Sequence, residues 1–163
     1  MLLTFSKYHG TGNDFIMVDA MKASVQVSPD QIIALCKRRF GIGSDGIIFL
    51  RPDHATDYHM DFYNPDGSQS FCGNGSRCAF AFARDLGYVS DHASFKAIDG
   101  EHQVKMEGAN IAVGMNDVTS VESVGDDLFM DTGSPHYLVW TNDLDDLDLV
   151  KEARYIRYIN AFG

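Results

Sequence analysis

A cysteine at the start of a glycine-rich loop is the feature of this sequence best suited to chemistry. The stretch 71-FCGNGSRCAFAFARDLGY-88 places Cys72 directly before Gly-Asn-Gly, and an apolar run follows. We expect this loop to open a helix, so its free backbone N–H groups and the helix dipole would form a site for an anion such as a carboxylate. The same dipole lowers the pKa of a thiol at a helix N-terminus. The sequence therefore predicts an activated thiolate beside a carboxylate site.

Each cysteine also has a simpler interpretation, as a small buried apolar side chain. We favour that interpretation for Cys36 and Cys78, since neither sits in a suitable glycine loop. We expect no metal, because Cys72 and Cys78 lack Cys-x-x-Cys spacing and a nearby pair of histidines. For Cys72, the residues alone leave hydrolysis, group transfer and proton abstraction open. A Cys–His acyl-transfer enzyme is one alternative on these grounds.

Three polar residues in turn sequences are further candidates. His136 lies in 133-GSPHY-137, and its alternative role is that of a loop histidine that caps backbone groups. Asn13 and Asn64 each adjoin a glycine or proline turn, where asparagine is favoured because it tolerates left-handed backbone geometry. Physical arguments alone favour a structural role for both asparagines.

A second glycine loop, 41-GIGSDG-46, matches the GxGxxG pattern of dinucleotide-binding proteins. That pattern requires a strand before the loop and a helix after it. Here a helix is expected before the loop and a strand after it, so the match does not indicate dinucleotide binding.

The composition limits the classes of partner. The 163 residues carry a formal net charge of −10, which argues against nucleic acid and anionic membrane surfaces as partners. The longest apolar runs are far shorter than the roughly 20 residues that span a bilayer. The first ten residues do not resemble a signal peptide. Three cysteines without framework spacing indicate reduced thiols, so we expect a cytoplasmic protein.

The elements that would position these residues can be read from periodicity and turn signals. Ser28 caps a helix that has Pro29 at its first position and Gln31 three residues after the cap. We expect this helix to reach the basic residues 37–39 and to end at Gly41. A central helix over about 74–86 has almost no polar face, which is typical of a helix wrapped by other structure. Short strands are expected at 3–8, 15–20, 46–50, 57–64, 94–98, 103–107, 110–115, 127–131 and 136–140, and an amphipathic helix over about 147–155. The prediction is an α+β fold, in which a curved antiparallel or mixed sheet wraps around one buried helix.

Four stretches together resemble the N-terminal half of the diaminopimelate epimerase family. They occur in the expected order over nearly the whole chain: 7-KYHGTGNDFIMVD-19, 39-RFGIGSDGIIFL-50, 60-MDFYNPDGSQSFCGNGSRCAFAFA-83 and 131-DTGSPHYLV-139. The resemblance implies an isomerase of lysine and peptidoglycan-precursor biosynthesis, which interconverts LL- and meso-diaminopimelate without a cofactor. One cysteine removes the α-proton as a thiolate, and a second delivers a proton to the opposite face. Backbone N–H groups at helix ends hold the substrate carboxylate.

The resemblance also assigns roles to residues. Cys72 matches one of the two acid/base cysteines, and His136 matches a histidine that supports catalysis near the site. Four residues match substrate-binding positions of the family: Asn13, Asn64, Gly73 and Asn74. Two positions depart from the pattern. Gly46 stands where some members carry a substrate-contacting glutamine, and Ser134 stands where many carry asparagine.

The resemblance leads to an expectation about domains. We interpret residues 1–163 as a single N-terminal epimerase-like domain, with residues from about 142 to 163 leading toward a second domain that supplies the other cysteine. On this view the chain alone is inactive as an epimerase. There are three alternatives. The chain is a fragment of a longer enzyme, or it is a relic, or its site is completed by another polypeptide or by a second copy in a homodimer. We favour the fragment.

Two other functions stay open at this point. One is a non-catalytic half-fold that binds a small amino acid or a partner subunit, which the missing second cysteine favours. The other is a related proline racemase-like or phenazine-biosynthesis isomerase-like protein, against which the paired HGTGNDF and CGNGSRC motifs argue.

Overall fold

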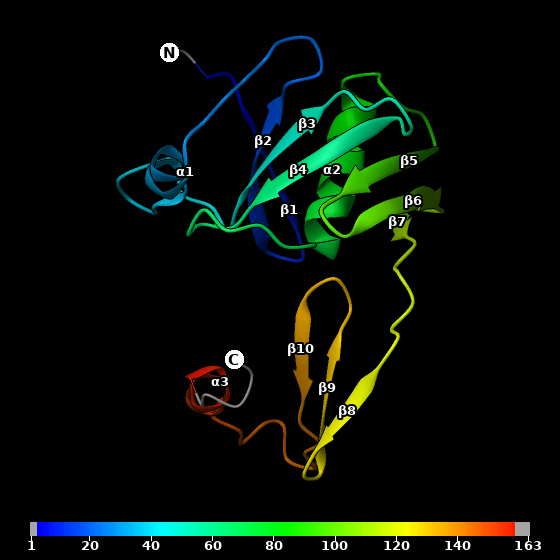
Figure 1. Ribbon diagram of the computed structural model, residues 1–163. Helices are drawn as coiled ribbons and strands as arrows, with labels where there is room; N and C mark the ends of the chain where they lie inside the picture. The colour runs from blue at the N-terminus through cyan, green and yellow to red at the C-terminus, as the bar shows by residue number, and fades with distance from the viewer. Residues whose placement is uncertain (1–2, 159–163) are drawn as a thin grey trace.

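The computed structural model describes residues 3–158, which form two sheets and three helices (Figure 1). The larger sheet contains β1 (Ser6–Gly10), β2 (Asn13–Asp19), β3 (Ile47–Arg51), β4 (Tyr58–Tyr63), β5 (His92–Ala97), β6 (Gly100–Glu107) and β7 (Asn110–Val113). The smaller sheet contains β8 (Val121–Val124), β9 (Asp127–Asp131) and β10 (Pro135–Leu138). The helices are α1 (Pro29–Cys36), α2 (Gly73–Asp85) and α3 (Leu149–Tyr158).

The seven strands of the larger sheet are paired in sequence order from β1 to β7. Neighbours are antiparallel except for the parallel pairs β2–β3 and β4–β5. A parallel pair needs a crossover connection. The first crossover contains α1 and the second contains α2. The sheet is therefore mixed, and its two crossovers bring the helices to its faces.

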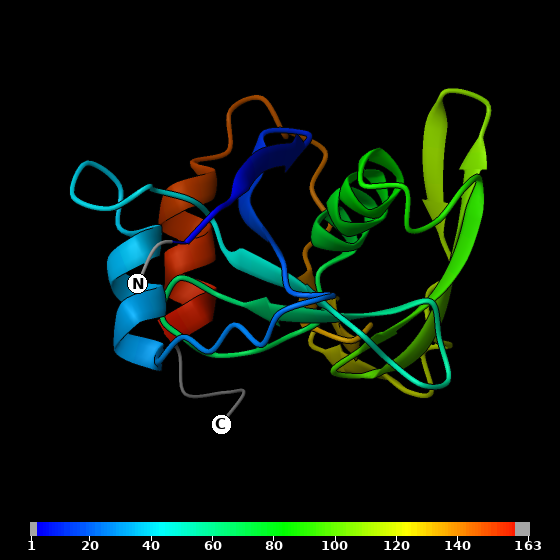
Figure 2. The ribbon, with the colours of Figure 1, turned by 90° about the horizontal axis from the view of Figure 1, so that it is seen from above.

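Helix α2 lies inside the curve of this sheet. It contacts β1 and β7, the two edge strands, as well as strands between them. One helix can touch both edges only if the sheet bends around it, and Figure 2 shows this curve from above. Seven of its residues are buried: Gly75, Ser76, Cys78, Ala79, Phe80, Phe82 and Ala83. The predicted α+β fold, with a curved sheet around a buried helix, is confirmed.

Strands β2 and β3 are buried on both faces, because α1 covers the face opposite α2. Successive side chains of a strand point to opposite faces. In β3, Ile48 packs in the α2 cluster, whereas Ile47 packs in a second cluster with Ile32 and Cys36 of α1. This arrangement explains the continuous apolar runs of these two strands.

Helix α1 begins as the sequence predicts but ends earlier. The hydroxyl of Ser28 accepts from the N–H of Gln31, and the Gln31 side chain accepts from the N–H of Ser28. The helix ends at Cys36, and Lys37 is already extended. The predicted continuation through the basic residues to Gly41 is wrong. Arg38 instead turns toward Asp14 and Asp45, to which it forms ion pairs.

The smaller sheet includes β8, a strand that the sequence analysis missed. Its four residues, Val121–Val124, are mostly exposed, so the alternation of a half-buried strand is absent. The hydroxyl of Ser134, in the loop before β10, donates to the carbonyl oxygen of Phe71 at 2.7 Å. This bond ties the smaller sheet to the residue before Cys72.

The C-terminal part of the described chain is largely exposed. Helix α3 begins at Leu149, two residues after the predicted start, and none of its residues is buried. Exposed apolar side chains include Trp140, Leu144 and Tyr155. No helix within residues 3–158 has the length and hydropathy needed to cross a membrane. Residues 159–163, part of the segment expected to lead toward a second domain, lie outside the described residues.

Candidate active site around Cys72

Cys72 occupies the N-cap position of α2, as the glycine loop predicts. Its backbone is extended, and its sulfur accepts a hydrogen bond from the N–H of Gly75 at 3.3 Å. The hydroxyl of Ser76 donates to the carbonyl oxygen of Cys72 at 2.9 Å. The sulfur is thus held at the open end of the helix, where the first N–H groups have no partner inside the helix.

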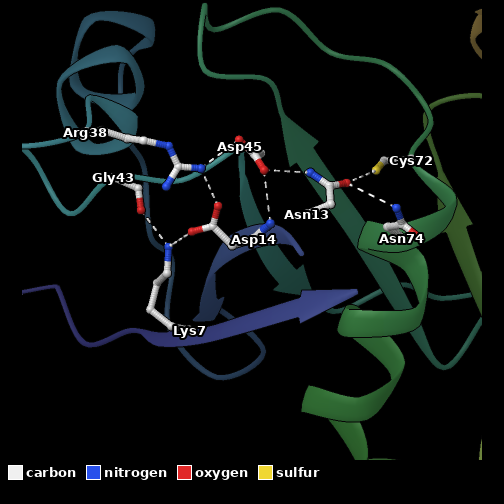
Figure 3. A network of polar contacts seen from close by, with 8 residues as sticks. All are labelled: Lys7, Asn13, Asp14, Arg38, Gly43, Asp45, Cys72 and Asn74. Atoms are coloured by element: carbon white, nitrogen blue, oxygen red, sulfur yellow. Dashed lines mark hydrogen bonds and ion pairs between the residues drawn. The ribbon is translucent and has the colours of Figure 1, made fainter. Parts of the chain in front are cut away.

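Two asparagines from separate elements meet at this thiol (Figure 3). The Oδ1 atom of Asn13, at the start of β2, lies 3.9 Å from the sulfur of Cys72. The same oxygen accepts from the Nδ2 of Asn74 at 3.4 Å. Three of the residues singled out in the sequence, Asn13, Cys72 and Asn74, therefore form one cluster, and Gly73 connects the latter two along the chain.

Asn13 reaches this position because the chain reverses sharply before it. Thr11 and Gly12, the two residues between β1 and β2, both have positive φ values, 54° and 87°. A two-residue connection with this geometry matches the twist of an antiparallel pair. Gly10 pairs with Asn13, and a Cβ atom added to Gly10 would lie 3.4 Å from the Cβ of Asn74. The glycine-rich HGTGND segment thereby brings the start of β2 against the first turn of α2.

The protonation of Cys72 reflects two opposing effects. Burial raises the pKa of the Cys72 thiol above its usual value, and hydrogen bonds from the N–H groups of Gly75 and Asn74 offset this only in part. The prediction of a lowered thiol pKa is wrong for this chain. The helix terminus acts in the predicted direction, but the loss of water around the sulfur outweighs it.

Cys36 and Cys78 are structural, as expected. Each side chain is only 3% exposed. Burial, followed by the neighbouring Cys72, raises the pKa of Cys78 to about 11, and burial also raises the pKa of Cys36. Within the described residues, no cluster of three or more His, Cys, Asp or Glu side chains could hold a metal ion.

Within residues 3–158, Asn64 forms no hydrogen bond with Cys72, Asn13 or Asn74. Its Nδ2 donates to the hydroxyls of Ser68 and Ser70, both at 3.2 Å. Asn64 lines a groove of about 870 Å³ together with Ser134 and Arg157. The hydroxyl of Ser134, at this groove, donates to the carbonyl oxygen of Phe71, the residue before the thiol.

His136 lies on β10 and is exposed. Its Nδ1 atom lies 2.8 Å from the carbonyl oxygen of Ser134 and 3.1 Å from the hydroxyl of Thr132. Within residues 3–158 no hydrogen bond joins His136 to Cys72. These contacts of His136 are local ones within the β9–β10 hairpin. Two hydrogen bonds join this hairpin to Phe71: the hydroxyl of Ser134 donates to the carbonyl oxygen of Phe71, and the N–H of Phe71 donates to the carbonyl oxygen of Gly133.

The sequence analysis missed the charged residues behind Asn13. The Nδ2 of Asn13 donates to Oδ2 of Asp45 at 3.0 Å, and Arg38 binds Asp45 and Asp14 at once. Asp14 is also paired with Lys7. The sequence signal that could have indicated these residues is that two glycine loops, HGTGND and GIGSDG, each carry an aspartate near their end.

Comparison with known proteins relates most of the chain to one family. The family model described as diaminopimelate epimerase matches residues 5–121. A diaminopimelate epimerase of Flavobacterium psychrophilum is 44% identical over 163 residues, which cover 96% of this chain and 62% of that protein. One of Chlorobaculum tepidum is 35% identical over 158 residues, which cover 91% of this chain and 62% of that protein. The chain therefore spans less than two thirds of the length of these relatives.

Solved structures share the fold at low sequence identity. A probable proline racemase from Agrobacterium radiobacter superposes with a TM-score of 0.61 at 12% identity, over 85% of this chain and 52% of that chain. A hydroxyproline epimerase from Agrobacterium vitis gives a TM-score of 0.60 at 12% identity, over 83% and 50%. These similarities establish the fold class alone.

Proposed function

Because this chain belongs to the diaminopimelate epimerase family, we propose that it forms part of an enzyme that interconverts LL- and meso-diaminopimelate without a cofactor. Lysine and peptidoglycan-precursor biosynthesis is the expected setting. The observation that carries the proposal is the position of Cys72 at the N-cap of α2, beside the amides of Asn13 and Asn74.

Cys72 would exchange one proton with the α-carbon. As a thiolate, its sulfur forms an S–H bond with the α-proton while the Cα–H bond breaks, and the electron pair moves into the substrate carboxylate. The N–H groups of the first turn of α2, from Gly73 and Asn74, are suited to hold that carboxylate as its charge grows. In the reverse direction the same sulfur, as a thiol, returns the proton. The raised pKa of Cys72 favours the thiol before substrate binds.

Inversion needs a second proton donor on the opposite face of the α-carbon. Cys36 and Cys78 are too deeply buried to provide it. We therefore place the second donor outside residues 3–158. We also keep the proposal that residues 1–163 form one N-terminal domain whose last part leads toward another domain. A second copy of the chain is the alternative source of the donor.

Asn64 and His136 have supporting roles in this proposal. The groove at Asn64 would receive the part of the substrate beyond the reacting carbon. His136 would act on the site through its hairpin, which Ser134 fastens to the residue before Cys72. Ser134, at the position of the family's asparagine, uses its hydroxyl for this attachment.

A second candidate function is a half-fold that binds an amino acid without chemistry. The raised pKa of Cys72 and the burial of the other two thiols favour it. It predicts the same ligand contacts around Asn13 and Asn74 but no change at the α-carbon of the ligand.

Substrate protection of Cys72 tests the proposed site. Iodoacetamide would be added to the folded chain with or without meso-diaminopimelate, and modification of Cys72 would be measured by peptide mass spectrometry. We expect diaminopimelate to slow the modification, and proline and lysine to have no effect at the same concentration. Equal protection by proline would favour a proline racemase-like substrate instead, and no protection by diaminopimelate would contradict the proposed site.

A further inference from the structure

Asn13 has only one orientation that satisfies its neighbours. Its Nδ2 atom lies 3.0 Å from Oδ2 of Asp45, and a carboxylate can only accept a hydrogen bond. The NH₂ group must therefore face Asp45, and the Oδ1 atom must face the other way. That direction leads to the sulfur of Cys72 at 3.9 Å and to the Nδ2 of Asn74 at 3.4 Å. The carboxylate of Asp45 thus determines which end of the amide the thiol meets.

Asp45 is itself held on both of its oxygens. Its Oδ1 accepts from Arg38 at 2.8 Å, and its Oδ2 accepts from the backbone N–H of Asp14 at 3.2 Å as well as from Asn13. Arg38 also binds Asp14 at 2.5 Å, so one guanidinium joins the two carboxylates.

Lys7 completes this arrangement at the end away from the thiol. It binds Asp14 and donates to the carbonyl oxygen of Gly43 at 2.6 Å. Two cations and two carboxylates therefore form a closed network behind Asn13, which Figure 3 shows from Lys7 to Cys72. The network connects β1, β2 and the loop before β3, so a shift of Asp45 would require several bonds to break.

We infer that Asp45, supported by Arg38, is a positioning residue that keeps the carbonyl end of the Asn13 amide facing the sulfur of Cys72. The inference rests on the proposed function only in taking Cys72 as the group that transfers the proton. An acceptor facing the sulfur can receive a hydrogen bond from the thiol but offers none to the thiolate. It favours the thiol, in opposition to the N–H of Gly75 at 3.3 Å, which favours the thiolate.

This balance matters for a group that must both give and take a proton. If Asp45 were neutral, the Asn13 amide could turn and present its NH₂ group to the sulfur. The thiolate would then gain a donor, and Cys72 would hold its proton less well. Besides Asp45, Arg77 of α2 acts on the sulfur by its charge, and Arg77 would be unchanged.

The test is the pH dependence of Cys72 alkylation in the wild-type chain and in Asp45→Asn. We expect the midpoint of the alkylation profile to fall by about 0.5–1 pH unit in Asp45→Asn. This is the shift expected when one hydrogen-bond acceptor at the sulfur is replaced by a donor. Asp91→Asn, which removes a carboxylate paired with Arg84 away from the site, is the matched control and should leave the midpoint unchanged. Thermal unfolding of each variant checks the fold, and Asp45→Ser replaces Asp45→Asn if the latter does not fold.

Loss of the charge of Asp45 could also shift the midpoint directly, and a double-mutant cycle separates the two effects. In an Asn13→Ala background, Asp45→Asn should shift the midpoint less, because the amide is gone and only the direct effect of the Asp45 charge is left. The same shift in both backgrounds, or no shift in either, would overturn the inference. Either result would leave the proposed function standing, since that depends on protection of Cys72 by diaminopimelate and not on its titration.

Discussion

The sulfur of Cys72 and the backbone N–H of Gly75 lie 3.3 Å apart at the first turn of α2. A Cβ atom added to Gly75 would lie 3.1 Å from Cδ1 of Ile48, 3.3 Å from Cβ of Cys72 and 3.4 Å from its sulfur. The close approach of the thiol and of strand β3, and not an unusual backbone angle, therefore leaves little room for a side chain at Gly75.

Gly75→Ala should destabilise the chain in spite of the higher helix propensity of alanine. We expect a loss of about 1–2 kcal/mol in the free energy of unfolding, measured with urea, because the added methyl group has no space. Gly73→Ala is the matched control. Its added Cβ would meet only the Nη1 of Arg77 at 3.5 Å, so its stability should stay the same or rise. Equal effects of the two substitutions would contradict this account of the loop.

Asp14 should contribute to stability over a defined range of acidic pH. Burial alone would raise its pKa, but hydrogen bonds from Arg38 and Lys7 outweigh this and lower it from 3.8 to about 2. Because folding lowers the pKa, ionised Asp14 stabilises the folded chain above pH 3.8, and this stabilisation is lost as the pH falls toward 2.

Urea unfolding at several pH values between 5 and roughly 2 tests this contribution. Asp14→Asn should be less stable than the wild type at pH 5, and the difference should narrow as the pH falls. Asp126→Asn, in the exposed turn between β8 and β9, is the control and should behave as the wild type does. A constant difference between Asp14→Asn and the wild type would show that Asp14 acts by its shape and not by its charge.

Gly46 should not accept the glutamine that some family members carry. An added Cβ would lie 2.4 Å from Cε2 of Phe62 and 2.8 Å from the carbonyl oxygen of Tyr63. We expect Gly46→Ala to cost about 1–3 kcal/mol of stability, and Gly46→Gln at least as much, in the same urea assay. Unchanged stability of Gly46→Gln, together with stronger protection of Cys72 by diaminopimelate, would show that this position can contact substrate.

His102 should be important for the stability of the sheet next to the site. Its ring is 3% exposed and stacks on Phe71 and Phe95, with centroids 4.5 and 5.2 Å away. Its nitrogens lie 2.9 Å from the carbonyl oxygen of Gly114 and 3.0 Å from Oδ1 of Asp99.

His102→Ala should therefore lower the free energy of unfolding by about 2–4 kcal/mol, because it creates a cavity beside Phe71 and Phe95 and removes the hydrogen bonds of the ring. His92→Ala, at the exposed first residue of β5, provides the comparison and should have little effect. A small effect of His102→Ala would mean that water satisfies both acceptors.

The elements that local patterns define were predictable from the sequence. The capping box of Ser28 and the glycine loop before α2 are both short-range signals, and both helices begin where these signals place them. The apolar residues of α2 also indicated correctly that other structure surrounds it. The end of α1 was not predictable in this way, because Arg38 is drawn to Asp14 and Asp45 by contacts that sequence spacing does not show.

The candidate site was predictable in its members but not in its electrostatics. Cys72 was identified from its glycine loop, and Asn13 and Asn74 from the family resemblance. Asp45 was not identified, since its role depends on a contact with Asn13 across 32 positions of the chain. The direction of the Cys72 pKa shift could not be predicted from the sequence either. It depends on how deeply the sulfur is buried, which is a property of the packed structure.

Proton NMR in D₂O, with the folded chain and each diaminopimelate stereoisomer, tests the central claim most directly. The α-proton signal and the appearance of the opposite stereoisomer would be followed together in the wild type, Cys72→Ser and Cys78→Ala. A single thiol returns a deuteron to the face from which it took the proton. We therefore predict α-proton loss without inversion in the wild type and Cys78→Ala, and no loss in Cys72→Ser. Unchanged α-proton signals with the wild type, or equal loss with Cys72→Ser, would contradict the assignment of Cys72 as the proton-transfer group.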